Sequence, residues 1–159
     1  MKEKNIKNTA AKPYTATDSH DSAVSETMLH YQSMYANDIA LLTHSKNGLS
    51  AKAALDFIAV SGFSYQEFQE IFKTTVKTIQ NYSIQNMKLD AALSEKLLKS
   101  FALFNKGFAL FGSPKAFHNW LNTSAYGLGN EIPYNFLDTI TGISLIEEEL
   151  IRIEYGDLA

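Results

Sequence analysis

The stretch Ser61–Ser83, "SGFSYQEFQEIFKTTVKTIQNYS", predicts two short helices separated by a tight turn. Ser64 and Glu67 have the S-x-x-E spacing of a capping box, in which each side chain accepts a hydrogen bond from the other residue's backbone N–H. The first helix then shows one apolar face at helical spacing, made of Phe68, Ile71 and Phe72. The polar residues 73–75 break this pattern, and Thr75 is a suitable N-cap for the second helix.

The second helix repeats the apolar spacing with Val76, Ile79 and Tyr82. Two short helices joined by so short a turn are typical of a helix-turn-helix, whose second helix lies in the major groove of DNA. Its outward side chains near the N-terminal end are the candidate DNA contacts: Thr75, Lys77, Thr78, Gln80 and Asn81. Asn and Gln pair with adenine, and Lys reaches guanine or phosphate. The competing interpretation is a helical hairpin whose polar residues only solvate its surface.

The composition excludes several classes of protein. At 159 residues, the chain is long enough for one domain or two small ones. It has no cysteine, which excludes disulfides and thiolate chemistry. Its apolar runs are much shorter than a membrane span and its N-terminus lacks the apolar core of a signal peptide, so we expect a cytoplasmic protein. Residues 1–27 are polar without periodicity, and we expect them to be a flexible segment.

The charges are unevenly distributed along the chain. Residues 62–107 hold six lysines and four acids, whereas residues 108–159 hold one lysine, one arginine and seven acids. A mildly basic middle and an acidic C-terminal part suggest two surfaces with different partners.

Further helices are predicted on either side of the helix-turn-helix. Residues 28–42 are predicted to form a helix with four apolar points, namely Leu29, Met34, Ile39 and Leu42. A stronger helix over 93–112 has a wide apolar stripe that includes Leu93, Leu97, Phe101, Phe104 and Phe108. Such a helix is buried between two halves of the chain or at a dimer interface, and residues 101–111 are the candidate dimer contact.

After Gly112 closes that helix, Ser113 and Pro114 have the N-cap and first-turn positions of the next one. This helix carries Trp120 and Leu121, whose helical spacing predicts core positions.

The segment 122–132, "NTSAYGLGNEI", interrupts the helices with a long turn. Its first residues favour hydrogen bonds between their side chains and the nearby backbone. Three residues tolerate a positive φ, namely Gly127, Gly129 and Asn130. Tyr126 and Leu128 lie on the turn itself and are predicted to be exposed.

The remaining residues predict two more helices. Pro133 is expected to start a helix that Gly142 closes. Ser144 and Glu147 have the spacing of a second capping box, which would open the last helix before Gly156 ends it. In that arrangement three acids lie in the first turn, where the helix dipole favours them: Glu147, Glu148 and Glu149.

An ordered series of residues runs through the last third of the chain. It consists of Phe111-Gly112, Trp120-Leu121, Leu128-Gly129, Pro133, Leu137, Thr139, Gly142, Leu150, Ile153 and Tyr155-Gly156. This series resembles the C-terminal toxin-binding domain of the Xre/MbcA/ParS antitoxins, and the part from residue 47 onward resembles their Xre-type helix-turn-helix. The resemblance implies an all-α fold with a flexible segment over 1–27, a helix-turn-helix and dimerisation region over 28–104, and a toxin-binding domain over 105–159.

The resemblance further implies a type II antitoxin without a cofactor, whose partner is a RES-domain toxin that depletes NAD⁺. The turn and the C-terminal tail are implied to cover the active site of the toxin through Tyr126, Leu128, Gly129, Asn130, Tyr155, Gly156, Asp157, Leu158 and Ala159. A homodimer that binds operator DNA and represses its own operon is also implied. The chain departs from the family in two places: Asn130 stands where relatives usually have glycine, and Asn81 and Tyr82 stand where relatives often carry arginine.

Catalysis by this chain is not expected. Its four histidines lack the spacing of metal ligands, no glycine-rich phosphate loop follows a strand, and no serine lies in a nucleophile elbow. Two alternatives to an antitoxin remain open: a stand-alone helix-turn-helix regulator and, more distantly, a small helical hydrolase.

Overall fold

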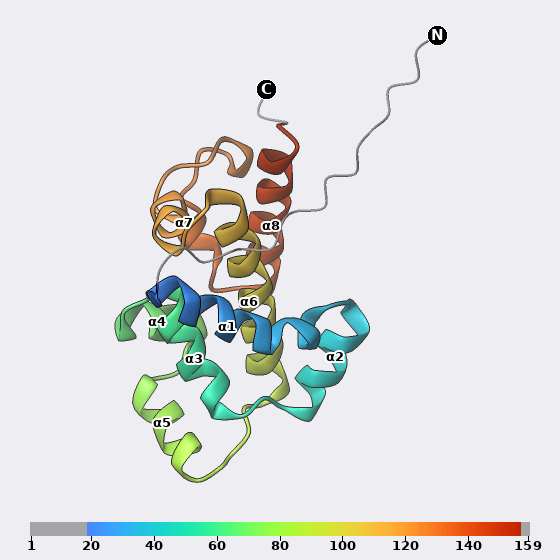
Figure 1. Ribbon diagram of the computed structural model, residues 1–159, viewed down its shortest axis with the longest axis vertical. Coiled ribbons are helices and arrows are strands. Elements are labelled where there is room, and N and C mark those ends of the chain that lie inside the picture. The colour runs from blue at the N-terminus through green and yellow to red at the C-terminus, as the bar shows by residue number, and fades with distance from the viewer. Residues whose placement is uncertain (1–18, 157–159) are drawn as a thin grey trace.

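The computed structural model describes residues 19–156, and every regular element in that range is a helix (Figure 1). The elements are α1 Ser19–Gln32, η1 Ser33–Tyr35, α2 Asp38–Asn47, α3 Ala51–Ser61, α4 Tyr65–Phe72, α5 Val76–Ile84, α6 Ala91–Phe111, α7 Pro114–Leu121, η2 Tyr126–Leu128, η3 Pro133–Phe136 and α8 Ile140–Glu154, where η denotes a 3-10 helix. Isolated β-bridges join Ser50 to Lys88 and Ala125 to Glu131. The predicted all-α class is confirmed.

The long helix α6 is the axis of the molecule (Figure 1). Its phenylalanines Phe101, Phe104 and Phe108 are fully buried. The ring of Phe104 lies 5.1 Å from that of Phe57 in α3 and 5.1 Å from that of Phe117 in α7. The helix is therefore buried between two halves of the same chain. These three side chains face the core of their own chain, and the dimer contact at residues 101–111 stays a prediction.

The helix-turn-helix has the predicted caps. The hydroxyl of Ser64 accepts the N–H of Glu67 at 3.1 Å, and the Glu67 carboxylate accepts the N–H of Ser64 at 2.7 Å. Thr75 caps α5 by accepting the N–H of Thr78 at 3.1 Å. Between the two helices, Lys73 takes the left-handed conformation with φ 57°. The sharp turn is therefore encoded locally, by the left-handed Lys73 and by the Thr75 cap, whose partner is three residues away.

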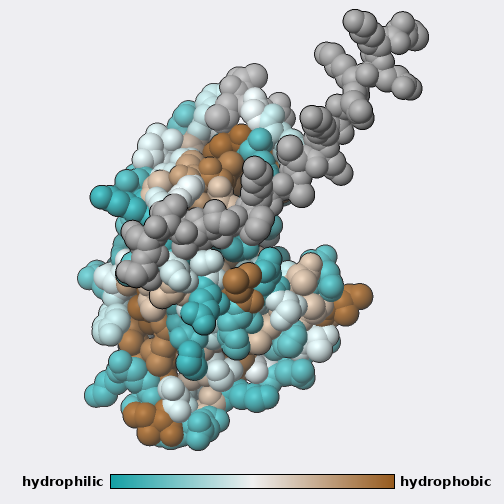
Figure 2. Space-filling view, in the orientation of Figure 1, coloured by the Kyte–Doolittle hydropathy of each residue, from teal (hydrophilic) through white to brown (hydrophobic). Residues whose placement is uncertain are grey.

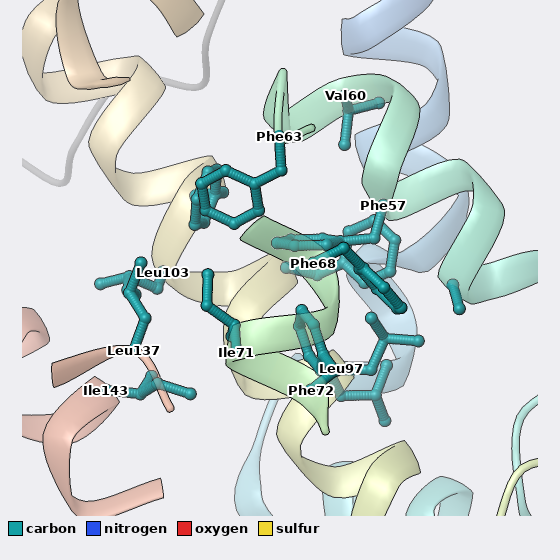
Figure 3. Close-up of a cluster of buried hydrophobic side chains, with 14 of the residues drawn as sticks. Phe57, Val60, Phe63, Phe68, Ile71, Phe72, Leu97, Leu103, Leu137 and Ile143 are labelled. Atoms are coloured by element: carbon teal, nitrogen blue, oxygen red, sulfur yellow. The ribbon is translucent and has the colours of Figure 1, made fainter. Parts of the chain in front are cut away.

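A single hydrophobic core runs through both halves of the described chain. Figure 3 shows Leu137 and Ile143 of the C-terminal part beside Leu103 of α6 and Ile71 of α4, and all four side chains belong to one buried cluster. Since α6 also crosses the predicted boundary at residues 104 and 105 without a break, the two parts share a core and a helix.

The N-terminal region differs from the prediction. Helix α1 begins at Ser19, inside the segment expected to be flexible, and it buries Val24 and Met28. A buried apolar face offsets the conformational entropy that a polar segment otherwise keeps by staying unfolded.

The predicted continuous helix over 28–42 is interrupted, because Asn37 caps a new helix by accepting the N–H of Ala40 at 2.9 Å. Three of the four apolar points are exposed: Leu29, Ile39 and Leu42 are 62%, 78% and 50% exposed. Figure 2 shows a hydrophobic patch at the edge of the molecule formed by α2.

The start of the last helix also differs from the prediction. Thr139 is the N-cap of α8 and accepts the N–H of Gly142 at 3.0 Å, so Ser144 lies inside the helix and forms no capping box. Gly142 does not close a helix. It lies in the first turn of α8, where a Cβ atom would come within 1.9 Å of the Phe136 carbonyl oxygen. The close approach of these two backbones sets the helix start, and Glu147 to Glu149 therefore lie in mid-helix.

Candidate interaction surfaces

The turn after α7 is built from its own polar side chains. Asn122 Nδ2 donates to the carbonyl of His118 at 2.9 Å, and Thr123 Oγ1 donates to that of Asn119 at 2.9 Å. These bonds satisfy carbonyls that the end of a helix leaves free. Gly129 and Asn130 then take positive φ values of 68° and 64°. The predicted left-handed conformation is confirmed at both positions.

A buried carboxylate fixes the middle of this turn from the other side. Glu149 of α8 is 1% exposed, and its Oε1 accepts the N–H of Gly127 at 3.1 Å. Arg152 Nε donates to Glu149 Oε2 at 2.7 Å, and Arg152 Nη2 donates to the Gly127 carbonyl at 3.2 Å. Gly127 is required for this contact, since a Cβ atom there would lie 1.7 Å from Glu149 Oε2.

Sequence reasoning missed this clamp of Glu149, Arg152 and Gly127. The signal was present, because Glu149 lies three residues after Ile146 and four before Ile153 and therefore falls on the apolar stripe of α8. An acid on a buried stripe needs a partner. Its partner on the turn is distant in the sequence, so the spacing alone did not identify it.

The predicted toxin contacts separate into exposed and buried residues. Tyr126 is 72% exposed at the tip of the turn, and Gly129 and Asn130 are exposed beside it. Leu128 is buried at 9%, which corrects the expectation that it is an exposed contact. The tight 3-10 turn η2 packs against α8 and directs Leu128 inward.

The C-terminal tail is described only at its start. Tyr155 is 70% exposed and Gly156 is exposed after the end of α8. Asp157, Leu158 and Ala159 lie outside the described residues.

The outer face of α8 carries apolar side chains that the sequence prediction did not single out. Leu145 and Ile151 are each 39% exposed, and with Glu148 and Tyr155 they recur every three or four residues along one side of the helix. Because η2 packs on α8, Tyr126 belongs to the same end of the molecule. We call Tyr126, Leu145, Ile151 and Tyr155 the C-terminal apolar face.

The predicted DNA contacts lie at the start of α5. Thr75, Lys77, Gln80 and Asn81 are exposed, and Thr78 is half-buried. The hydroxyls of Thr75 and Thr78 are hydrogen-bonded to each other at 2.9 Å. Helix α5 and the C-terminal end of α8 lie at opposite ends of the long axis (Figure 1).

A hollow of about 550 Å³ lies between α4 and the start of α5. It is lined by Tyr65, Gln66, Gln69, Glu70, Thr75, Val76 and Lys77. The outward residues of α4 were not among the predicted DNA contacts. Three of them are exposed beside α5, namely Tyr65, Gln66 and Gln69.

A polar brace connects the helix-turn-helix to the C-terminal half. Lys96 of α6 donates to the carbonyls of Ile71 in α4 and of Asp138 just before α8. Burial lowers the pKa of Lys96, an effect that the nearby Asp138 opposes. Lys73 Nζ lies 3.8 Å from Asp138 Oδ2 at the surface.

A second connection joins η3 to α4. The Tyr134 hydroxyl donates to Glu70 Oε2 at 3.3 Å, and burial together with the Glu70 charge raises the pKa of Tyr134 to about 12. The turn of the helix-turn-helix is therefore held from the C-terminal side.

Within residues 19–156, no three His, Cys, Asp or Glu side chains are grouped as metal ligands would be. None of the helices in that range is long and apolar enough to cross a membrane. The described arrangement is a helical protein of the helix-turn-helix class, with an exposed apolar face at the opposite end of the molecule.

Comparison with known protein families agrees with this class. Residues 40–100 match the antitoxin Xre-like helix-turn-helix domain, and residues 106–156 match the antitoxin Xre/MbcA/ParS C-terminal toxin-binding domain. The chain belongs to the Xre/MbcA/ParS antitoxins, as the ordered series of residues predicted. Among curated proteins, none matches the chain.

Proposed function

We propose that this chain neutralises a RES-domain toxin that depletes NAD⁺, by docking its C-terminal apolar face over the active site of the toxin. The observation that carries this proposal is the exposure of Tyr126, Leu145, Ile151 and Tyr155 on the toxin-binding domain. Tyrosine is enriched among the few residues that dominate the binding energy of protein interfaces, and a group of exposed apolar side chains is typical of a docking surface.

The proposed mechanism is steric, and this chain performs no chemistry in it. Residues 155–159 continue from the end of α8 and would lie in the cleft where NAD⁺ binds. Residues 108–159 hold seven acids and two basic residues. Such an acidic domain suits a cleft that is positively charged because it binds a pyrophosphate. Asp157 would occupy part of the phosphate site.

We also propose that the chain represses its own operon as a homodimer. Thr75, Lys77, Thr78, Gln80 and Asn81 would contact operator DNA through α5, in the major groove. This part of the proposal rests on the helix-turn-helix match and on the exposure of the start of α5.

The first test is a rescue assay with the protein encoded beside this gene. That neighbour is expressed alone and with the full chain, and growth and cellular NAD⁺ are followed. Growth arrest with NAD⁺ loss, reversed by the full chain, is the expected result. A harmless neighbour, or toxicity that the full chain does not relieve, would leave a stand-alone transcriptional regulator as the better interpretation.

Variants then test the docking face. Tyr126→Ala combined with Ile151→Asp should weaken toxin binding by at least about 30-fold, since truncating interface anchors costs about 2 kcal/mol or more. Leu42→Asp on α2 is the matched control, because Leu42 is an exposed apolar residue outside the C-terminal domain. Two further variants change only the tail: a chain that ends at Tyr155, and Asp157→Lys. They test the contribution of the tail to neutralisation separately from that of the C-terminal apolar face. Full protection by both tail variants would exclude the tail as a plug.

A further inference from the structure

One acidic side chain lies among the apolar side chains of the C-terminal apolar face. Glu148 is exposed on α8, three residues after Leu145 and three before Ile151. Since an α-helix has about 3.6 residues per turn, a step of three residues moves about 60° around the axis and about 4.5 Å along it. Glu148 therefore lies between Leu145 and Ile151 both around the helix and along it, and a partner that covers these two side chains also covers Glu148.

Two other acids of α8 are engaged within the chain, and Glu148 is not. Glu149 Oε2 accepts from Arg152 Nε at 2.7 Å, and Lys106 Nζ lies 3.1 Å from Glu154 Oε2. Within the described part of the chain, the side chain of Glu148 forms neither an ion pair nor a hydrogen bond. Arg152 lies one turn further along α8, but its guanidinium is held by Glu149. In the free chain, water therefore solvates the charge of Glu148.

A docked partner has to replace this water. A carboxylate that leaves water needs an opposite charge or hydrogen-bond donors in return. Glutamate is depleted in protein interfaces, whereas arginine is enriched there. The guanidinium is planar, is more weakly hydrated than an ammonium group and donates two parallel hydrogen bonds to a carboxylate. An arginine bordered by apolar side chains is therefore the surface that matches Leu145, Glu148 and Ile151.

We infer that Glu148 determines which toxins this chain accepts, by pairing with an arginine that the toxin presents between apolar side chains. This inference rests on the proposed docking of the toxin on the C-terminal apolar face, and it adds a specificity residue and the chemistry of the matching surface. Glu148 lies in the part of the chain that matches the toxin-binding domain, residues 106–156. A toxin with an apolar or acidic side chain opposite Glu148 is rejected, because the carboxylate is then buried without a partner.

The experiment measures the association and dissociation rates of the full chain on the purified protein that is encoded beside its gene, by surface plasmon resonance. Glu148→Gln should weaken binding by about 30-fold or more, because it leaves the charge of the arginine without its counter-charge. Most of this loss should be a faster dissociation, since contacts inside an interface change the dissociation rate and charges outside it change the association rate. Glu26→Gln, at an exposed glutamate of α1, is the matched control with the same change in net charge.

A second variant, Glu148→Leu, distinguishes a cationic partner group from an apolar one. Leucine extends the apolar face, so binding should tighten if the toxin covers this position with an apolar side chain. Opposite an arginine, leucine removes both the charge and the hydrogen-bond acceptor, and binding should be at least as weak as that of Glu148→Gln. A Glu148→Leu chain that binds as tightly as the wild-type chain, or more tightly, overturns the inference.

The outcomes separate this inference from the proposed function. If the wild-type chain does not bind the neighbouring gene's protein, the proposed neutralisation fails and the inference fails with it. If the wild-type chain binds and Glu148→Gln binds as tightly as Glu26→Gln, toxin docking stands and the inference is overturned. A loss confined to the association rate also overturns it, because long-range attraction then accounts for the effect. Urea unfolding checks that both Glu148 variants are folded, and their stability should stay near that of the wild-type chain because Glu148 is exposed.

Discussion

Replacing the buried carboxylate that fixes the turn, in Glu149→Gln, tests how the docking face is held in place. The amide oxygen of glutamine can still accept the N–H of Gly127, but its NH₂ group would face the donors of Arg152. The guanidinium loses its counter-charge, at a position where the Glu149 side chain is 2% exposed and the Arg152 side chain is 38% exposed.

The size of the effect follows from these exposures. Breaking a fully buried ion pair by removing one partner costs about 3–5 kcal/mol, whereas exposed pairs contribute about 0–1 kcal/mol. Because solvent reaches Arg152, we expect a loss of about 1–2 kcal/mol in the free energy of unfolding. For a chain of this size, that loss lowers the Tm by about 2–8 °C.

Gly127→Ala disrupts the same clamp of Glu149, Arg152 and Gly127 from the side of the turn. Its Cβ atom would displace the Glu149 carboxylate, so the two substitutions remove one shared set of contacts. The double variant should therefore be less destabilised than the sum of the single effects, with a coupling of about 0.5 kcal/mol or more. Both single variants should also bind the toxin more weakly, because Tyr126 precedes Gly127 on the turn.

The assay is urea unfolding followed by circular dichroism, combined with toxin binding. Glu148→Gln is the control, since Glu148 is exposed on the neighbouring position of the same helix, and it should change the unfolding free energy by less than about 0.5 kcal/mol. If Glu149→Gln is as stable as Glu148→Gln and binds the toxin as tightly as the wild-type chain does, the reasoning about the clamp is refuted.

Three further predictions concern the stability of the fold. Gly142→Ala should lower the unfolding free energy in thermal melts by about 3 kcal/mol, because its Cβ atom meets the Phe136 carbonyl oxygen. The control is Gly112→Ala, whose Cβ atom would lie in open space at φ 85°, and it should lose only about 1–2 kcal/mol. Ser64→Ala should lose about 0.5–2 kcal/mol in urea titrations, and equal stability to wild type would show that the capping box contributes nothing. Burial raises the pKa of Tyr35 to about 12, and an unfolded tyrosine releases its proton near pH 10. Stability should therefore fall as the pH rises from about 10 to about 12, and Tyr35→Phe should make this fall in Tm smaller, while the part due to Tyr134 remains.

Elements set by neighbouring residues could be predicted from the sequence, and elements set by distant contacts could not. The cap at Ser64, the N-cap at Thr75 and the left-handed Asn130 all depend on atoms within a few residues. Ser144 repeated the local spacing of a capping box, but the start of α8 is decided at Gly142, whose backbone must approach that of Phe136.

The exposure of Ile39 was missed for a local reason. Its spacing is compatible with a core face, but the N-cap at Asn37, which the sequence analysis did not identify, starts a new helix on which that side chain is exposed. The clamp escaped prediction because the partner of Glu149 on the turn lies 22 residues away. Leu128 was placed on the surface because a turn residue is usually exposed, whereas its side chain packs inward under α8.

The contact between α4 and the loop before α8 also limits how toxin specificity can be exchanged among relatives. Grafting residues 106–156 onto another antitoxin would bring Tyr134 and Asp138 against whatever stands at the positions of Glu70 and Lys73. A recombinant that carries these α4 positions along with the graft keeps both contacts, whereas one that does not must form this junction from other side chains.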